Sequence, residues 1–309
     1  MSLKGRHLLS VSALSKNEIR VLFDKTEEFL NSKSHLTSNE LAGAILGLLF
    51  TQSSIRTRNS FCRSFIKLGG SVLQSPEIEQ RLITRKSNED LRDVISYYTS
   101  YIDILALRTG ERSIAELVAG ASHVPVVSAG ISGQEHPTTA LAKAYSIKTK
   151  TGRLHGHKVL LVAEHESRSL TSLLNLLPKF GCNEYHILTL EPKAYDKLNS
   201  GKVVVFRADK CNLIDLLVHK YSVMIFDESE RARNSDRFVD SAKFTFKQYG
   251  SQENLEYLAH LKPIIRLFDR DLKYYYDKHG IEESNVSTAM KSAVLYWALE
   301  QGKDHSKYI

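Results

Sequence analysis

Short apolar runs alternate with helical patterns along almost the whole chain, and this alternation limits the possible folds more than any other feature. Each run has the length of a strand, and the segments between runs space apolar residues three and four apart, as amphipathic helices do. The runs cover residues 43–50, 71–74, 102–107, 124–127, 158–164, 186–190, 203–206, 223–226 and 263–268. Such a pattern is typical of parallel sheets covered by helices, so it predicts an α/β protein.

The runs form two series, which predict two subdomains, each an open parallel sheet covered by helices. The chain has 309 residues, 42% of them apolar, which is enough for two cores. We expect the first subdomain to comprise residues 1–135 and 287–309, and the second to comprise residues 150–286. A helix over 136–149, with Pro137 in its first turn, is expected to link them.

The net charge of the chain favours anionic ligands over cationic ones. Lysine and arginine outnumber aspartate and glutamate by 42 to 35, which gives a formal charge of +7. Basic helices interleaved with aromatic residues and recognised nucleic-acid modules are missing from the sequence, so we expect no nucleic-acid partner.

The lengths of the apolar runs and the spacing of the cysteines indicate the cellular compartment of the protein. The longest apolar run, at 41–50, is about half the length needed to cross a bilayer, so we expect a soluble protein with no membrane partner. Cys62, Cys182 and Cys211 have no paired spacing, which predicts neither a disulfide framework nor a thiolate metal site. A reducing cytoplasm fits this use of cysteine.

Polar and cationic side chains follow three strands of the first half, each at the carboxyl end of its strand. Ligands of open α/β sheets bind beyond these ends, where helix N-termini expose backbone N–H groups. Cations are disfavoured at a helix N-terminus unless an anion is bound there, so arginines at such a position favour an anion site. The side chains concerned are those of Ser54, Arg56, Thr57, Arg58, Arg108 and His136. Together they predict a site for a phosphate or a phosphoanhydride.

A plainer interpretation exists for each of these residues alone. Arg56 and Arg58 could be solvated residues at the start of a helix, and His136 could be a loop histidine whose hydrogen bonds are satisfied locally. The convergence of three strand ends is what favours a functional site over these alternatives.

The same segments resemble a known family, the aspartate and ornithine carbamoyltransferases. "SSIRTRNSF" at 53–61, followed by "IKLGGSV" at 66–72, is similar to the family loop S-T-R-T-R with its helix and L-G-x-S-V. "LRTG" at 107–110 and "SAGISGQEHPTT" at 128–139 resemble two further family motifs. The likeness covers nearly the whole chain and is closer to the aspartate branch, because no H-C-L-P motif of the ornithine type is visible.

The resemblance implies a carbamoyltransferase fold and a transferase that acts in pyrimidine biosynthesis without a metal or a cofactor. One subdomain would bind carbamoyl phosphate and the other an amino acid, in a homotrimer with shared active sites or in a hetero-oligomer. By position, Ser54, Arg56 and Thr57 would hold the phosphate, and Arg108 and His136 would bridge the phosphate and the carbamoyl oxygen. Attack by an amine builds negative charge on that oxygen, which Arg108, His136 and Thr57 could stabilise.

Several positions depart from the family pattern in the first half. Ile55 replaces a threonine of the phosphate loop, and Thr139 replaces a glutamine that would reach the carbamoyl group. The loop that family members lend to a neighbouring subunit carries a serine and a lysine. Here Leu82 stands near the serine position and Lys86 is the candidate lysine, although Lys86 could equally be a solvated loop lysine.

The second half departs further. Arg168 aligns with an arginine that contacts the acceptor carboxylate, whereas Glu228 and Glu230 stand where an arginine and a glutamine are expected. In "KPIIR" at 262–266, Ile264 is a candidate for substrate binding. Ile265 replaces the proline that the family uses, in a cis bond, to aim backbone carbonyls at the substrates.

Two functions therefore stay open. The chain could transfer the carbamoyl group of carbamoyl phosphate to an amino acid, which is aspartate by resemblance or an altered acceptor. Alternatively, it could be a degenerate, non-catalytic member of the family that acts as a binding or assembly subunit. The five substitutions at Ile55, Leu82, Thr139, Glu228 and Ile265 motivate the alternative.

Overall fold

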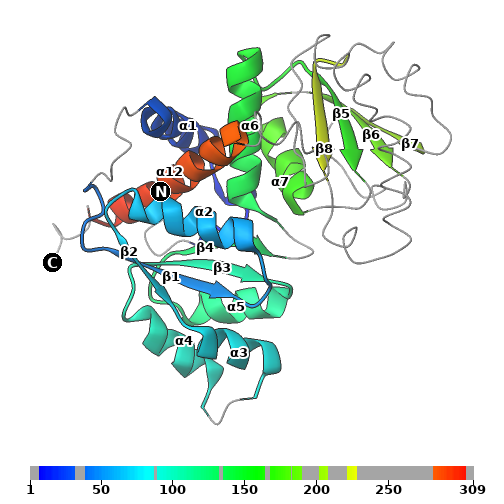
Figure 1. Ribbon diagram of the computed structural model, residues 1–309. Coiled ribbons are helices and arrows are strands. Elements are labelled where there is room, and N and C mark those ends of the chain that lie inside the picture. Colours follow the sequence, from blue (N-terminus) through cyan, green and yellow to red (C-terminus); the bar gives the residue numbers. More distant parts are fainter. Residues whose placement is uncertain are drawn as a thin grey trace. The chain divides into compact units, whose positions relative to one another are not determined.

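The computed structural model of the protein is an α/β structure with two compact units, which confirms the predicted class (Figure 1). One unit comprises Met1–Ala142 and Ile281–Ile309, and the other comprises Lys143–Gly280. The structure describes residues 7–31, 39–86, 89–131, 135–163, 168–181, 183–189, 202–207, 221–227 and 281–303.

The first unit is built on a four-stranded parallel sheet. Its strands are β1 (Ile45–Phe50), β2 (Ser71–Gln74), β3 (Ile104–Thr109) and β4 (Val126–Ile131), and they pair in the order β2-β1-β3-β4. Its helices are η1 (Val11–Ala13), α1 (Lys16–Asn31), α2 (Ile55–Ile66), α3 (Pro76–Thr84), α4 (Leu91–Thr99), α5 (Arg112–Ala121) and α12 (Ile281–Lys303). Figure 1 shows α3, α4 and α5 on one side of the sheet and α1, α2 and α12 on the other.

Both faces of this sheet are buried. The strands read as continuous apolar runs, because side chains that alternate between two covered faces are all removed from water. On one face a single apolar cluster joins the sheet to α3, α4 and α5; it includes Leu49, Leu82, Ile95, Tyr98, Leu105, Leu107, Ile114, Val118 and Ile131. Burial of this cluster fixes the sheet beneath the strand ends that carry the polar residues.

Helices α2 and α12 pack closely on the opposite side because small hydroxyl residues lie between them. Ser64 Oγ donates to the Thr288 carbonyl at 2.9 Å, and Ser292 Oγ donates to the Ser64 carbonyl at 3.1 Å. Phe61 and Phe65 of α2 are fully buried. The C-terminal helix, which begins at Ile281, thus belongs to the core of the first unit.

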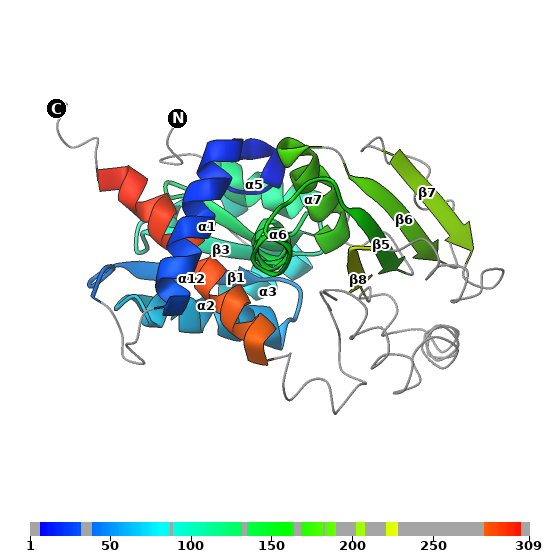
Figure 2. The same ribbon diagram turned by 90° about the horizontal axis from the view of Figure 1, so that it is seen from above.

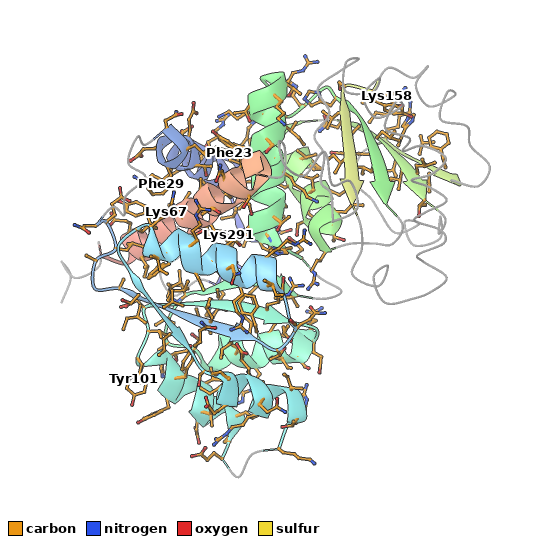
Figure 3. The ribbon with its side chains drawn as sticks, viewed as in Figure 1. Phe23, Phe29, Lys67, Tyr101, Lys158 and Lys291 are labelled. Atoms are coloured by element: carbon orange, nitrogen blue, oxygen red, sulfur yellow. The ribbon has the colours of Figure 1, made fainter. Side chains whose placement is uncertain are left out.

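A lysine is buried in this helix pair. Lys291 of α12, labelled in Figure 3, is 2% exposed. Its Nζ donates to Ser287 Oγ at 2.6 Å and lies 5.5 Å from the centroid of the Phe61 ring. These contacts are with uncharged groups, and burial lowers the pKa of Lys291 to about 7.

Two glycines follow the end of α2. The helix stops at Ile66, and Gly69 then adopts a positive φ of 86°, which a glycine adopts without strain. A side chain at Gly70 would have its Cβ 2.3 Å from Phe65 Cε1, so the approach to β2 requires a glycine there. The two glycines therefore let the chain leave α2 and enter β2.

The second unit contains another parallel sheet. Its strands are β5 (Lys158–Ala163), β6 (Glu184–Thr189), β7 (Lys202–Arg207) and β8 (Val223–Asp227), in the order β7-β6-β5-β8 (Figure 2). Helix α6 (Pro137–Thr151) runs from the first unit into the second, and α7 (Arg168–Leu176) and η2 (Leu177–Phe180) follow β5. The predicted strand at 263–268 lies outside the described residues.

Two further observations bear on what the sequence predicted about its helices and apolar segments. Residues 79–84, which the family resemblance predicted as part of a loop, belong to helix α3 (Pro76–Thr84). Within the described ranges, the helices are all too short or too polar to cross a membrane.

Candidate active site

The topology of the first sheet brings the sequence-predicted strand ends together. The chain passes from β1 outward to β2 and then returns to β3 on the other side of β1, so the strand order reverses between β1 and β3. Phe50 and Arg108 are register partners at the ends of these strands, and the Thr51 N–H donates to the Arg108 carbonyl at 2.9 Å. Open α/β sheets bind ligands at such a switch point.

Helix α2 opens directly after β1 and presents a polar first turn. Ser54 is its N-cap residue, and the Ser54 hydroxyl bonds the Thr57 hydroxyl at 3.0 Å without capping a backbone N–H. The first turn contains no acidic residue, and Arg56 is exposed. The positive end of the helix dipole therefore lies beside two hydroxyls and a cation, an arrangement suited to an anion.

Arg108 is buried at the end of β3. It is 5% exposed, and its Nη1 donates to the Ala129 carbonyl on β4 at 3.2 Å. Its Nε is buried and makes no hydrogen bond within the described part of the chain. A guanidinium buried at this end of the sheet provides a fixed positive charge where the solvent screens it weakly.

His136 is held at the end of the neighbouring strand β4. The Ile131 N–H donates to the Glu135 carbonyl at 3.1 Å, which ties Glu135 to the last residue of β4, and His136 is 7% exposed. The Glu135 carboxylate accepts from Ser10 Oγ at 2.6 Å and from the Val11 N–H at 2.8 Å. The N-terminal segment thus fixes the residue that precedes His136.

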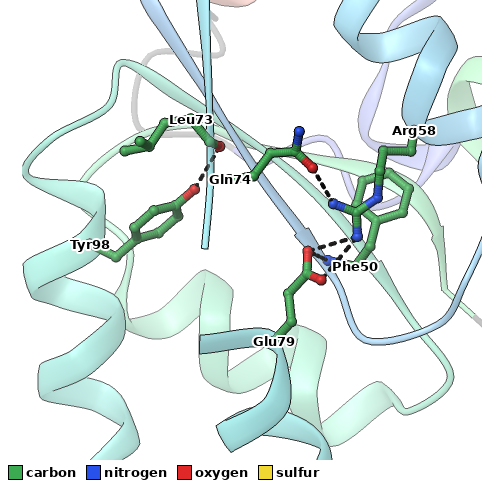
Figure 4. A network of polar contacts seen from close by, with 6 residues as sticks. All are labelled: Phe50, Arg58, Leu73, Gln74, Glu79 and Tyr98. Atoms are coloured by element: carbon green, nitrogen blue, oxygen red, sulfur yellow. Dashed lines mark hydrogen bonds and ion pairs between the residues drawn. The ribbon is translucent and has the colours of Figure 1, made fainter. Parts of the chain in front are cut away.

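Arg58 has a partner that the sequence pattern did not predict. Its Nη2 lies 2.9 Å from Oε1 of Glu79 and 3.0 Å from Oε2, and its Nη1 donates to Gln74 Oε1 at 2.6 Å (Figure 4). Glu79 also accepts from the Phe50 N–H at 2.8 Å. Of the two arginines expected to face an anion, Arg58 is engaged within its own unit, and Arg56 is the one on the exposed first turn.

The departures from the family pattern have different surroundings. Ile55 is 69% exposed at the start of α2, whereas Leu82 is 1% exposed in the core under α3. Thr139 is half-buried in the first turn of α6, where its N–H donates to the His136 carbonyl at 3.1 Å. Lys86 is exposed two residues after the end of α3.

The second sheet has its own switch point between β5 and β8. Arg168 is the first residue of α7, which follows β5, and Asp227 ends β8. Glu228, Glu230, Ile264 and Ile265 lie outside the described residues. The described part of this unit therefore brings Arg168 alone, among the predicted acceptor-binding residues, to the edge where ligands bind.

Three residues near the site were missed in the sequence: Gln74, Glu79 and Glu135. Their partners lie 16 to 125 residues away along the chain, so no local spacing indicates these contacts. Within the described ranges, His, Cys, Asp and Glu side chains form no group of three that could hold a metal ion.

Comparisons with known proteins agree with this arrangement. Residues 6–149 match the family model of the aspartate/ornithine carbamoyltransferase carbamoyl-P binding domain. An aspartate carbamoyltransferase catalytic subunit from Thermococcus onnurineus is 34% identical over 275 residues, which cover 86% of this chain and 85% of that protein. One from Methanococcus vannielii is 28% identical over 298 residues, covering 94% and 97%.

A solved structure extends the likeness to the fold. The catalytic subunit of M. jannaschii aspartate transcarbamoylase superposes with a TM-score of 0.79 at 25% identity, over 96% of this chain and 99% of that one. The fold and the strand-end residues thus define a protein of the carbamoyltransferase class. Within this class, the chain belongs to the family of aspartate carbamoyltransferase catalytic subunits.

Proposed function

We propose that the protein transfers the carbamoyl group of carbamoyl phosphate to the amino group of aspartate. The observation that carries this proposal is the burial of Arg108 at the end of β3, beside the end of the strand β1 that leads into the polar first turn of α2, at the switch point of the first sheet. The relatives named aspartate carbamoyltransferase catalytic subunit support the reaction and the acceptor.

The first unit would hold the donor. The α2 amides, Ser54, Thr57 and Arg56 would bind the phosphate, because charge-assisted hydrogen bonds from a cation and a helix N-terminus suit phosphate oxygens. Ile55 supplies no hydroxyl here, so the phosphate would have one donor fewer than in the family pattern. Thr139, in the first turn of α6, and Lys86, which the family resemblance assigns to the site of a neighbouring subunit, are proposed to contact the donor.

The chemical step needs charge stabilisation more than it needs a covalent catalyst. When the amine attacks the carbamoyl carbon, negative charge develops on the carbamoyl oxygen, and the C–O bond to phosphate then breaks. Arg108, His136 and Thr57 would donate to that oxygen, with burial of Arg108 and His136 raising the strength of the interaction. The phosphate leaves with the bonding electron pair while it is held by α2, and it takes the proton that the attacking amine loses.

The second unit would bind the acceptor. Arg168 at the switch point of the second sheet would pair with an acceptor carboxylate, and Glu228, Glu230 and Ile264 are proposed to line the same site. Two carboxylates among these residues would disfavour the side chain of aspartate by a few kcal/mol in a partly desolvated site, so an acceptor with a second amine should be tested too. Homotrimers with shared sites, or a hetero-oligomer, would complete the assembly.

A second candidate is a binding or assembly subunit that has kept the donor site and lost turnover. The burial of Leu82 favours it, because the residue near the family's serine position packs into its own core instead of facing a ligand.

Turnover separates the two candidates. The protein is mixed with carbamoyl phosphate and with aspartate or other amines, and phosphate and ureido product are quantified. We expect product with the unmodified protein and with Arg112→Met, which removes an exposed arginine, and little product with Arg108→Met. Lack of product across a broad panel of amines would leave the binding subunit as the function.

A further inference from the structure

The contacts of Arg58 and Glu79 connect three elements around the proposed phosphate site. Arg58 lies in the second turn of α2, Glu79 lies in α3, and both contact Phe50, the last residue of β1 (Figure 4). The Phe50 N–H donates to Glu79, and the Arg58 guanidinium stacks on the Phe50 ring, with Cζ of Arg58 4.6 Å from the ring centroid. We propose that Arg58 and Glu79 act as one positioning unit that fixes the first turn of α2 and the segment leading to Lys86. This inference rests on the proposed donor site.

At the end of β1, Glu79 accepts a backbone hydrogen bond that a carbonyl of a neighbouring strand would otherwise accept. The β1–β2 ladder ends with the pair Leu48 and Gln74, so the Phe50 N–H lies beyond it. The Glu79 carboxylate accepts this N–H and both hydrogen bonds from Arg58 Nη2. The exit of the chain from β1 toward α2 is thereby tied to α3.

Burial makes the pair stronger than an ordinary surface ion pair. The Arg58 and Glu79 side chains are 24% and 13% exposed, and two carboxylate oxygens accept from one guanidinium nitrogen. By comparison, the pair between Arg112 and Glu116 on α5 is 73% and 61% exposed, which places it in the class of ion pairs that contribute little. Glu116 therefore offers a matched control for the loss of one carboxylate.

The geometry also separates positioning from direct binding of an anion. Both terminal nitrogens of Arg58 are engaged, one by Gln74 and one by Glu79. A planar guanidinium spans these two acceptors at once, whereas a lysine ammonium of the same charge cannot hold both in the same geometry. Arg58 thus acts on the phosphate through the placement of α2, and its charge is already balanced by Glu79.

The consequence for Lys86 follows from the same contact. Helix α3 ends at Thr84, and Arg85 adopts a left-handed conformation with φ of 54°, which turns the chain toward Lys86. Because Glu79 anchors α3 to the end of β1, it sets where this turn begins. Loss of the pair should loosen the Lys86 segment and the phosphate turn together.

Substitution of Glu79 should change phosphate affinity in opposite directions, depending on whether Glu79 acts through its charge or by positioning α2. Removal of a carboxylate near an anion site strengthens anion binding if only charge matters. If positioning matters, Glu79→Gln weakens it, and we expect inorganic phosphate to bind about ten- to a hundredfold less tightly by calorimetry. Arg58→Lys should weaken binding as much as Arg58→Met does, although it retains the charge.

Controls keep the test independent of folding. Affinity is measured below the onset of unfolding, with the folded fraction checked by circular dichroism, and Glu116→Gln should change affinity by less than about twofold. Arg58→Met with Glu79→Gln should cost no more than the worse single variant, because the two residues act as a unit. Unchanged or tighter phosphate binding by folded Glu79→Gln would overturn the positioning role. Absence of phosphate binding by the unmodified protein would instead overturn the proposed donor site, and the positioning role with it.

Discussion

The carboxylate of Glu135 accepts a hydrogen bond from Ser10 Oγ at 2.6 Å, across 125 residues of sequence. The adjoining Leu8 pairs with β4, where the Leu8 N–H donates to the Val126 carbonyl at 2.8 Å and the Ser128 N–H donates to the Leu8 carbonyl at 2.9 Å. The N-terminal segment therefore holds both the strand that precedes His136 and the residue directly before it.

Removal of this contact should affect catalysis more than substrate binding. Glu135→Ala leaves the Ser10 hydroxyl and the Val11 N–H without their acceptor, and we expect a loss of about 1–3 kcal/mol in unfolding free energy. Because His136 then loses its fixed position, kcat should fall about tenfold or more with a smaller change in KM. Ser10→Ala, which removes one of the two bonds, should show a smaller effect on both quantities. A drop in stability with an unchanged kcat would show that Glu135 is structural only.

Restoration of the family threonine at position 55 should improve donor binding. Ile55 is 69% exposed at the first turn of α2, so Ile55→Thr removes little buried apolar area and should leave the melting temperature nearly unchanged. The new hydroxyl adds a donor at the helix N-terminus, and phosphate affinity by calorimetry should rise about threefold to tenfold, as expected for one additional hydrogen bond. Ile55→Val, which adds no hydroxyl, is the matched control. Equal affinities for the threonine and valine variants would contradict the placement of the phosphate.

The corresponding change at position 82 should fail. Leu82 is 1% exposed in the apolar cluster, so Leu82→Ser leaves a cavity and buries a hydroxyl. We expect a loss of about 3 kcal/mol or more in unfolding free energy, measured by denaturant titration, with no gain in activity. Leu82→Met, of similar volume, should cost less than about 1.5 kcal/mol. An active, stable serine variant would show that residue 82 faces a ligand.

Lys291 should make the stability of the protein depend on pH. Burial lowers its pKa from 10.5 to about 7, so the unfolded chain binds a proton between these values and the folded protein does not. The unfolding free energy is therefore highest above pH 10.5, where Lys291 is neutral in both states, and it decreases as the pH falls toward 7. Lys291→Met should raise the unfolding free energy by a few kcal/mol near pH 7, and the gain should shrink toward pH 10. Lys16→Met, which replaces an exposed lysine, is the control. A gain that does not vary with pH would contradict burial of the ammonium group.

The strands were the most predictable part of the fold. Strand β2 occupies the predicted residues 71–74, and the other described strands begin or end within a few residues of the apolar runs. The largest difference at a carboxyl end is in β4, which continues to Ile131 through the buried Ser128. A serine reads as polar in the sequence, and only the structure shows that its hydroxyl bonds the backbone of Gly130 and Glu135.

The candidate site was predictable in its charged residues and unpredictable in their supports. Arg108 lies near the carboxyl end of β3 and His136 follows β4, and because these strands are parallel neighbours, the rule for open sheets predicts that both residues lie at the same edge. Glu79 and Glu135 contact residues that are distant in the chain, and each sits in a polar segment that looks solvated. The sequence pattern also did not indicate helix α3, because Leu82 is its one fully buried residue and several charged residues lie close to Leu82 in the sequence.

Calorimetric titration with carbamoyl phosphate, compared with inorganic phosphate, tests the donor site most directly. We predict that the unmodified protein binds carbamoyl phosphate more tightly than phosphate, because Arg108 and His136 recognise the carbamoyl oxygen in addition to the phosphate. Arg108→Met should bind both ligands with similar, weaker affinity, whereas Arg112→Met should behave as the unmodified protein. Equal affinity of the unmodified protein for the two ligands would contradict a carbamoyl-phosphate site.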